Sequence, residues 1–260
     1  MKSQIKTIII TGGAGEGIGG GITRVMAQNG WIPIIVDCDH VKGQEMVNEL
    51  SVKGYKSFFY HGDLTQSQIP EKVIEFALDK TGKIDGLVNN AGKGLTKDLT
   101  EVNDKELMAL INLDFIVIVK LCRAVIGELI KTQGGIINIG SVHTRGACVN
   151  YGLYAAVKMA VSAFSRGLAY DFGNRNVRSN CIHPGLVESP QNYALAAKIS
   201  PNPQEWLDDF AKKHQCTPYA ITPNDIGEYV SFLMSEKSKG ITGQDLYIDS
   251  GTSAMMIERD

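Results

Sequence analysis

A tyrosine and a lysine four residues apart are the clearest candidates for chemistry in this sequence. Tyr154 and Lys158 are separated by about one helical turn, so in a helix the phenol and the ammonium project from the same face. A tyrosine titrates near pH ~10 in water, but a nearby cation stabilises the phenolate and brings its pKa toward neutrality. The pair is therefore a candidate acid–base catalyst, although the spacing alone fits a surface pair equally well.

A glycine-rich segment near the amino terminus is typical of a phosphate-binding turn. Residues 11–21 read Thr-Gly-Gly-Ala-Gly-Glu-Gly-Ile-Gly-Gly-Gly and lie between a β-rich run and a helical pattern. Glycines there let backbone N–H groups approach a pyrophosphate, and the start of the following helix favours negative charge. Gly15, Gly17 and Gly20 match G-x-G-x-x-G, but so many glycines leave the register open, and a purely structural turn is the alternative.

Acidic residues near this turn bear on the choice of nucleotide. Asp37 ends the second predicted strand, where a carboxylate accepts hydrogen bonds from both hydroxyls of an adenosine ribose and repels a 2′-phosphate. Glu16 adds negative charge inside the turn, where a 2′-phosphate would need Lys or Arg. Both residues favour NAD over NADP. Asp63, after the third predicted strand, either caps a helix or contacts adenine.

Size and composition describe an ordinary soluble globular protein. The chain has 260 residues, of which 43% are apolar and 21% charged, and its net charge is −2. This balance gives no reason to expect nucleic acid or an anionic membrane as a partner, and apolar runs such as 115–119 are too short to span a bilayer. Five scattered cysteines without a C-x-x-C pair predict reduced thiols and no metal site, and residues 1–6 lead into a strand without a signal-peptide core. We therefore expect a cytoplasmic protein.

Apolar β-rich runs alternate with helical periodicity along the chain. Ile18, Ile22 and Val25, for example, follow helical spacing, and Asn29-Gly30 predicts a stop. The alternation predicts an α/β fold with a doubly wound, Rossmann-type, mostly parallel seven-stranded sheet and helices on both faces. We expect one domain over residues 1–260, with a proline-rich, lid-like insertion at about 189–218. The predicted strands span residues 7–11, 32–37, 56–61, 84–89, 135–140, 177–183 and 245–249.

Together these features resemble the single-domain branch of the short-chain dehydrogenase/reductase family over nearly the whole chain. Ser141 ends the fifth predicted strand thirteen residues before Tyr154, which is the usual distance in the family. The glycine-rich turn departs from the family pattern by one extra residue, and taking Gly13 as the first glycine restores the spacing. Further matching segments are Asn89-Asn-Ala-Gly92, Asn112 in an apolar helix, Asn180-Cys-Ile-His-Pro-Gly185, Ile241-Thr-Gly-Gln244 and Asp249-Ser-Gly251.

The resemblance implies hydride transfer between a nicotinamide and a carbinol carbon. In this view Tyr154 exchanges the alcohol proton, while Lys158 lowers the tyrosine pKa and binds the nicotinamide ribose. Ser141 holds the substrate oxygen, and Asn112 bends its helix and fixes a water that links Lys158 to solvent. His143 is a further substrate-binding candidate, beside Ser141 and Tyr154; a loop histidine bound to backbone is the alternative.

The resemblance also implies a set of cofactor-binding residues, in which Ser189 stands where a hydroxyl often bonds the nicotinamide carboxamide. The full set for NAD is Gly13, Gly17, Ile18, Gly19, Asp37, Asp63, Leu64, Asn90, Ala91, Gly92, Tyr154, Lys158, Pro184, Gly185, Val187 and Ser189.

The substrate stays open at this point. His143 and Asn150 favour a polyol, sugar or hydroxy acid, whereas Leu186 and Val187 suit a bulky apolar alcohol such as a steroid. A non-catalytic NAD-binding sensor or scaffold is a second hypothesis, and an S-adenosylmethionine-dependent methyltransferase is a third, which would leave the Tyr–Lys pair without a role. Because the family is usually tetrameric, the resemblance implies a homo-oligomer, most often a tetramer.

Overall fold

A single parallel sheet organises the chain. The computed structural model describes residues 5–146 and 148–255, so residues 1–4, part of the stretch without a signal-peptide core, lie outside the described part. Within it, seven strands follow the order β3-β2-β1-β4-β5-β6-β7, all paired in parallel, which confirms the predicted doubly wound sheet. The strands are β1 (Lys6–Thr11), β2 (Trp31–Asp37), β3 (Phe58–His61), β4 (Gly86–Asn89), β5 (Gly135–Ile139), β6 (Arg178–Pro184) and β7 (Asp245–Ile248).

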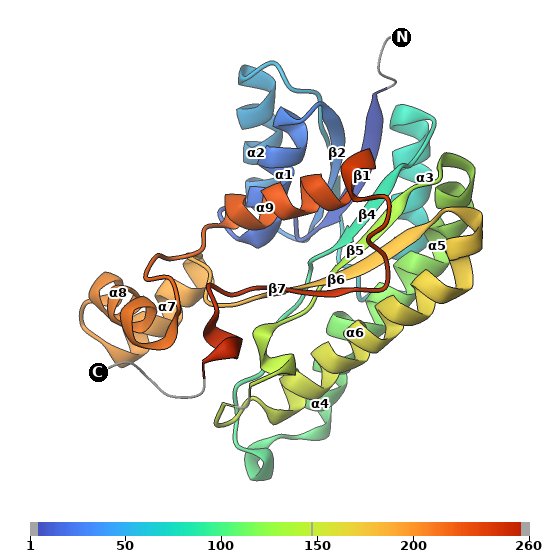
Figure 1. Ribbon diagram of the computed structural model, residues 1–260. Coiled ribbons are helices and arrows are strands. Elements are labelled where there is room, and N and C mark those ends of the chain that lie inside the picture. The colour runs from blue at the N-terminus through green and yellow to red at the C-terminus, as the bar shows by residue number, and fades with distance from the viewer. Residues whose placement is uncertain (1–4, 147, 256–260) are drawn as a thin grey trace.

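Helices cover both faces of this sheet (Figure 1). Helices α1, α2 and α9 lie on one face, and α3, α5 and α6 lie on the other. The helices are α1 (Ile18–Gln28), α2 (His40–Val52), α3 (Ile69–Thr81), α4 (Asp104–Ile111), α5 (Val117–Thr132), α6 (Gly152–Phe172), α7 (Pro190–Ile199), α8 (Pro203–His214) and α9 (Pro223–Leu233). A π-helical turn, η2 (Asn112–Ile116), joins α4 to α5, and a 3₁₀ turn, η3 (Val142–Thr144), follows β5. None of the described helices has the length and hydropathy that a membrane span needs.

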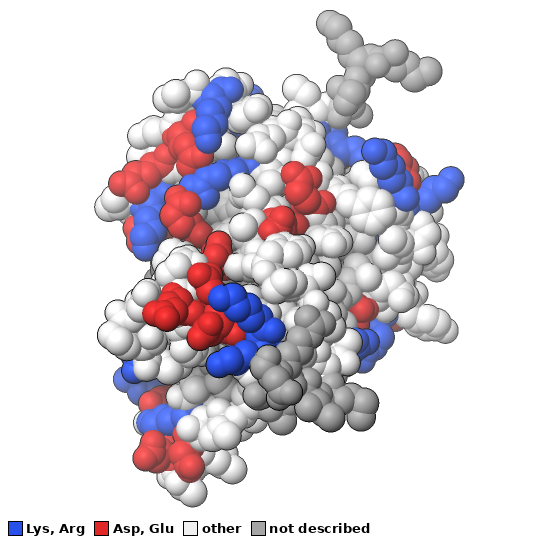
Figure 2. All heavy atoms as spheres, turned by 60° about the vertical axis from the view of Figure 1, so that its left-hand side comes forward, with Lys and Arg blue, Asp and Glu red and all other residues white. Residues whose placement is uncertain are grey.

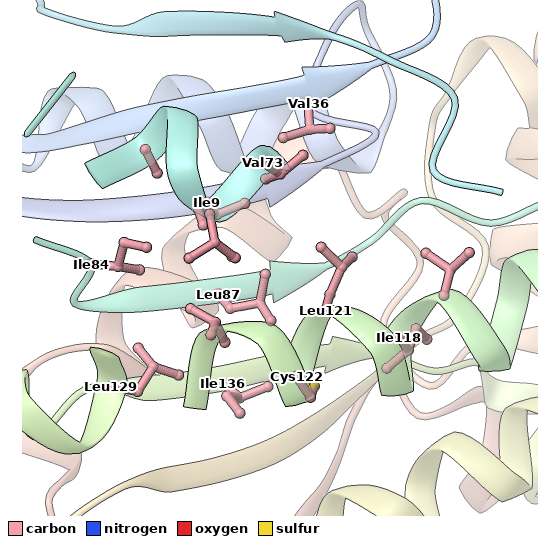
Figure 3. Packing of buried hydrophobic residues seen from close by; sticks show 14 of the residues in the cluster. Ile9, Val36, Val73, Ile84, Leu87, Ile118, Leu121, Cys122, Leu129 and Ile136 are labelled. Atoms are coloured by element: carbon pink, nitrogen blue, oxygen red, sulfur yellow. The ribbon is translucent and has the colours of Figure 1, made fainter. Parts of the chain in front are cut away.

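The core forms because the central strands are apolar on both faces. Along β1, Ile9 faces the side of α3 and α5, while Ile8 and Ile10 face α1 and α9. Figure 3 shows Ile9 and Leu87 packed against α5 residues such as Leu121, all fully buried. Burying a side chain of this size stabilises the fold by about 1.5–3 kcal/mol.

The order of the strands reverses between β1 and β4. β1 pairs with β2 on one side and with β4 on the other, so the chain segments that leave these two strands turn in opposite directions. In parallel sheets this point opens a crevice at the carboxyl ends of the strands. Thr11 ties the two sides together, because its hydroxyl oxygen accepts hydrogen bonds from Asn90 N at 2.9 Å and Ala91 N at 3.0 Å.

The predicted lid consists of two capped helices beyond the end of β6 (Figure 1). The prolines that interrupt the sequence pattern begin these helices: Pro190 is in the first turn of α7 and Pro203 in that of α8. Ser189 and Asn202 precede them as caps, each accepting a backbone hydrogen bond through its side chain.

Candidate active site

The glycine-rich turn is packed through backbone contacts. A Cβ on Gly19 would lie 1.9 Å from the carbonyl oxygen of Gly12, and one on Gly20 would lie 1.8 Å from that of Gly15. Gly12 and Gly15 have φ values of +59° and +74°, which favour glycine. Gly17 caps α1, and a Cβ there would meet nothing within 4 Å. The backbone N–H groups at the start of α1 therefore lie beside an open approach for an anion.

The close partner of Gly19 is Gly12, not the Gly13 of the register chosen to restore the family spacing. Thr11 and Gly12 together support the turn after β4, because Asn90 Nδ2 donates to the carbonyl oxygens of both at 3.0 Å.

Asp37 lies where the sequence predicts it, at the end of β2 and beside the turn. Its Oδ2 accepts a hydrogen bond from Ala14 N at 3.2 Å, and its Oδ1 accepts one from Asp39 N at 3.0 Å. The neighbouring cations are already paired: Arg24 contacts Glu16 and Glu49, and Lys42 contacts Asp39 at 3.2 Å. Negative charge therefore dominates the surroundings of Asp37.

Asp63 stabilises a local turn and does not cap α3, whose N-cap residue is Gln68. Its Oδ1 accepts hydrogen bonds from Thr65 N at 2.9 Å and from Thr65 Oγ1 at 2.7 Å, in a turn well ahead of α3. The side chain of the next residue, Leu64, is buried in the core on the α3 side. Contact of these residues with adenine stays a prediction.

Tyr154 and Lys158 share one face of α6, as their spacing predicts. Lys158 Nζ lies 5.6 Å from the centre of the Tyr154 ring. Lys158 is only 4% exposed, and its ammonium donates a hydrogen bond to the Ile139 carbonyl at 3.2 Å. Burial lowers the pKa of Lys158, but the negative charges of ionised Tyr154 and of Asp114 outweigh this effect and raise it above its ordinary value. Lys158 therefore stays a cation beside the phenol.

Ser141 lies just beyond the end of β5, at the start of the segment that carries His143. It is buried, follows Ile139 by two residues, and its Oγ accepts the His143 backbone N–H at 3.3 Å at the start of η3. The His143 ring in turn meets the Tyr154 ring edge to face, with their centres 5.9 Å apart. β5 and α6 thus bring residues from separate parts of the sequence to one place.

Asn112 lies at the start of the π-helical turn. The Val117 N–H bonds back to the Asn112 carbonyl, five residues earlier, in place of the usual four. The structure shows a π turn at this place, and the bend that the family resemblance implies stays a prediction. The same turn directs Asp114 inward, where its Oδ2 lies 3.2 Å from Lys158 Nζ.

Comparison with known proteins agrees with this geometry. A family model described as Enoyl-(Acyl carrier protein) reductase matches residues 13–253. The 3-oxoacyl-(acyl-carrier-protein) reductase FabG of Chlamydia pneumoniae is 31% identical over 249 residues, which cover 95% of this chain and 96% of that protein. The chain belongs to the short-chain dehydrogenase/reductase family.

Relatives in this family differ in substrate. A 7alpha-hydroxysteroid dehydrogenase of Bacteroides fragilis is 32% identical over 256 residues, covering 96% of this chain and 95% of the relative. The crystal structure of L-sorbose reductase from Gluconobacter frateurii, complexed with NADPH and L-sorbose, superimposes with a TM-score of 0.92 at 25% identity, covering 98% of this chain and all of that one. The protein is therefore an oxidoreductase of a family that acts on alcohol and ketone groups.

In this short-chain dehydrogenase/reductase, His143 forms part of an aromatic wall. Its ring stacks on Tyr151 with centres 4.2 Å apart, and Tyr151 meets Tyr154 edge to face at 6.2 Å. Burial lowers the pKa of His143, and a hydrogen bond with the Gly146 backbone opposes this only in part, so the imidazole is neutral at pH 7. A neutral ring here can exchange a hydrogen bond with a bound hydroxyl.

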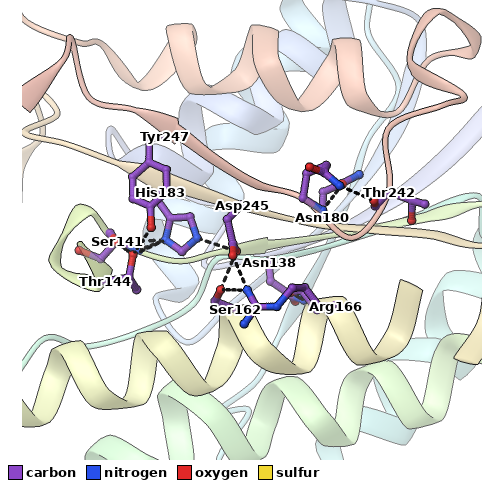
Figure 4. A network of polar contacts seen from close by, with 12 residues as sticks. Asn138, Ser141, Thr144, Ser162, Arg166, Asn180, His183, Thr242, Asp245 and Tyr247 are labelled. Carbon is purple, nitrogen blue, oxygen red and sulfur yellow. Dashed lines mark hydrogen bonds and ion pairs between the residues drawn. The ribbon is translucent and has the colours of Figure 1, made fainter. Parts of the chain in front are cut away.

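A polar network lies behind Ser141 (Figure 4). His183 is fully buried, and its Nδ1 is 3.1 Å from Ser141 N. Because a carboxylate can only accept, we assign a ring proton to Nε2, which lies 3.0 Å from Asp245 Oδ1. Nδ1 also lies 3.0 Å from the Ser141 carbonyl oxygen, so it contacts both backbone groups of Ser141. Asp245 also binds Ser162 and Arg166 on α6. The network thus connects the backbone of Ser141 to a partly exposed ion pair.

The same region holds a possible set of metal-binding atoms. Cys181, His183 and Asp245 offer donor atoms within 4.8 Å of one another. The carboxylate is already bound by Ser162, His183 and Arg166, and burial raises the pKa of Cys181 to about 12. Hydrogen bonding accounts for this cluster, and the expected lack of a metal site stays a prediction.

Four of the predicted cofactor residues, Pro184, Gly185, Val187 and Ser189, lie at the end of β6 or just after it. Pro184 ends the strand, and a Cβ on Gly185 would lie 2.8 Å from Asp249 Cα. Val187 is buried, and Ser189 Oγ accepts Asn192 N at 3.3 Å as the cap of α7. This segment and the glycine-rich turn line the same groove, which has a volume of about 670 Å³. The residues that line the groove include Glu16, Arg24, Glu188, Ser189 and Tyr193.

Sequence reasoning missed Asp114, Asp245 and Tyr151. Asp114 had a signal, because it is a lone charge in an apolar run over residues 113–119. Asp245 and Tyr151 had none. Asp245 meets His183 only because β6 and β7 pair in the folded sheet, and Tyr151 meets His143 only through the fold of η3.

Proposed function

We propose that this protein is an NAD-dependent dehydrogenase of a secondary alcohol, or a reductase of the matching ketone. The observation that carries the proposal is the convergence at Tyr154: the Lys158 ammonium, His143 and the segment of Ser141 lie around it. The same carboxyl edge of the sheet holds the glycine-rich turn.

The residues divide the chemistry among them. A bound nicotinamide would accept or supply the hydride at its C4 atom. Tyr154 would take the alcohol proton in oxidation and return it in reduction, with the Lys158 charge stabilising the phenolate. Ser141 would hold the substrate oxygen within hydrogen-bond reach of Tyr154. Asn112, whose carbonyl is engaged by the π turn, would support the route of the proton to solvent.

The choice of NAD rests on charge around the second strand. Asp37 and Glu16 are acidic, and Arg24 and Lys42 are paired with carboxylates, which leaves a 2′-phosphate without a free cation among these groups. The proposed cofactor differs from the one in the L-sorbose reductase structure, which contains NADPH. The remaining predicted contacts, from Gly17, Ile18, Gly19, Asn90, Ala91, Gly92, Pro184, Gly185, Val187 and Ser189, belong to the same proposal.

Kinetics with both cofactors test this choice. We expect wild-type kcat/KM for NAD+ to exceed that for NADP+ by about a hundredfold, and Asp37→Ala to reduce the ratio about tenfold or more by removing the ribose contact and the repulsion. Arg175→Gln, in the 3₁₀ turn that follows the carboxyl end of α6, is the control and should keep the ratio. A wild-type preference for NADP+ would overturn the proposal.

The walls beside Tyr154 support a polar substrate. His143, Tyr151 and Tyr154 present a neutral imidazole and two phenols, which suit a polyol, sugar or hydroxy acid. A panel of polyols, sugars, hydroxy acids and hydroxysteroids, assayed with NAD+ at alkaline pH by the absorbance of NADH, tests this. We expect turnover to be highest with a polyhydroxylated or acidic alcohol. Preference for the steroid would favour the bulky apolar alternative.

An apolar groove supports a homo-oligomer, with a tetramer as the proposed state. The groove of about 260 Å³ lies between α4, η2 and α6, and is lined by Leu107, Ile111, Phe115, Leu153, Ala156, Val157 and Ala160. A second copy would remove this surface from water. Light scattering of Ala160→Glu should show smaller species than wild type, while Tyr170→Glu, at an exposed position of α6, should not.

The other expected partners are small molecules. On the face shown in Figure 2, acidic and basic side chains are interspersed and form no broad basic field, in line with the proposal that nucleic acid is not a ligand. We place the protein in the cytoplasm because its cysteines, Cys38, Cys122, Cys148, Cys181 and Cys216, are free thiols.

A further inference from the structure

A buried carboxylate lies directly against the lysine of the candidate site. Asp114 is 0% exposed, and its Oδ2 is 3.2 Å from Lys158 Nζ. Its Oδ1 accepts the Lys93 backbone N–H at 2.8 Å. Apart from this ammonium, no residue that the structure describes donates a hydrogen bond to Oδ2, so the contact with Lys158 is the one that compensates the burial of this oxygen.

The π turn and Gly92 together position the Asp114 carboxylate beside Lys158. The π turn carries Asp114 inward from a run that is otherwise apolar over residues 113–119. On the opposite side stands Gly92, where a Cβ would lie 2.8 Å from Asp114 Oδ2 and 3.4 Å from Lys158 Nζ. A larger residue at position 92 would press into the ion pair.

The ammonium has a carboxylate and an ionisable phenol as neighbours. The titratable groups that act on Lys158 are Tyr154 on its own helix, Asp114 on η2 and Cys181 on β6. Burial raises the pKa of Cys181 to about 12, so this thiol is neutral and the effective anions are Asp114 and, once ionised, Tyr154. At the Tyr154 hydroxyl, the negative potential of the Asp114 carboxylate opposes the positive potential of the ammonium. The carboxylate therefore reduces the stabilisation that Lys158 gives to a phenolate.

We propose that Asp114 is a positioning residue of the Tyr154–Lys158 pair: its carboxylate fixes the ammonium and cancels part of the positive charge presented to the phenol. The inference rests on the proposed function, in which Tyr154 exchanges a proton with the substrate. The proposed role has opposite consequences for the two directions of the reaction. By keeping the phenol protonated to higher pH, Asp114 favours ketone reduction at neutral pH, where Tyr154 must donate, and moves alcohol oxidation to more alkaline conditions.

The pH profile of Asp114→Asn tests the proposal. This variant keeps the shape and an oxygen that can accept from Lys93 N, but it removes the charge. For alcohol oxidation, kcat/KM is measured from about pH 6 to about pH 11. We expect the acid limb to move toward lower pH by about one unit, so that oxidation below the limb becomes about tenfold faster. A limb that stays in place, whatever the rate, or that moves to higher pH overturns the proposal.

Asp85→Asn is the matched control. Asp85 is also a buried carboxylate, with Thr7 N at 2.8 Å and Lys83 Nζ at 3.3 Å, but it lies at the amino end of β4, away from Tyr154. We expect it to lower thermal stability and to leave the limb in place; an equal shift in this control would show that the effect is not specific to Asp114. If Asp114→Asn does not fold, Asp114→Thr serves instead, because it is also neutral and should shift the limb in the same direction.

The fate of the proposed function is read separately. If Tyr154→Phe keeps wild-type turnover, the proposed function fails and the profile of Asp114→Asn has no bearing on it. If Tyr154→Phe is inactive and the limb of Asp114→Asn does not move, only the role of Asp114 fails.

Discussion

The two ends of the candidate site are built in different ways. At the nucleotide end, the glycine-rich turn and α1 meet through backbone atoms, and the Gly19–Gly12 contact leaves no room for a single methyl group. At the catalytic end, side chains from several elements are held by charged groups, namely the buried Asp114 with Lys158 and the partly exposed Asp245 with His183. We therefore expect an added atom to disrupt the structure and binding of the nucleotide end. We expect the removal of a charge to lower the activity of the catalytic end.

Gly19→Ala should show the first kind of failure most strongly. Its Cβ would lie 1.9 Å from the Gly12 carbonyl oxygen, and backbone at this place cannot move without opening the turn. We expect a loss of about 3 kcal/mol in the free energy of unfolding and NADH binding weakened about a hundredfold. Denaturant unfolding and fluorescence titration with NADH measure both.

Gly127→Ala is the control for that substitution. Gly127 lies inside α5, where a Cβ meets nothing within 4 Å, so alanine should leave binding unchanged and stabilise the protein by up to about 1 kcal/mol. Wild-type affinity and stability in Gly19→Ala would contradict the backbone-packed description of the turn.

Asp245→Asn should show the second kind of failure on a smaller scale. The change keeps the shape but removes the charge that receives His183 Nε2–H and pairs with Arg166. A charged hydrogen bond of this kind contributes about 1.5–3 kcal/mol, so we expect kcat to fall about tenfold as Ser141 loses its support. NADH affinity should not change.

Arg166→Gln separates the two contacts of that carboxylate. It removes the exposed partner and leaves the His183–Asp245 contact in place, so kcat should stay within about twofold of wild type. If it lowers kcat as much as Asp245→Asn does, the support of Ser141 does not run through His183.

Glu49→Gln should have the smallest effect. It removes a partly exposed carboxylate that pairs with Arg24 beside the glycine-rich turn. Hydrogen bonds from Arg24 and Lys53 hold the pKa of Glu49 at about 2, below its ordinary value of 4.5. A lowered pKa stabilises the fold above pH 4.5, and this contribution is lost as pH falls toward 2. We expect a loss of about 1 kcal/mol at pH 7, after allowing for solvent screening. The difference in denaturant midpoint should shrink steadily below pH 4.5; a constant difference would exclude an electrostatic origin.

Much of the fold and part of the site follow from the sequence, for physical reasons. All seven strands were predictable because they are short apolar runs between helical patterns, and Tyr154 with Lys158 because α6 converts a spacing of four into one face. The register of the glycine-rich turn was not, because many glycines fit one pattern and only packing singles out Gly12. Asp245 was not, because its partner His183 lies on another strand, and the π turn behind Asp114 leaves no mark in helical periodicity.

Turnover and cofactor binding in Tyr154→Phe, measured on one preparation, test the central claim most directly. The substitution removes the hydroxyl and keeps the ring beside His143 and Lys158. We predict that NADH formation from the best alcohol of the panel falls by about a thousandfold or more, while the Kd for NADH stays within about twofold of wild type. Turnover that persists near the wild-type rate, with NADH bound normally, would contradict the account.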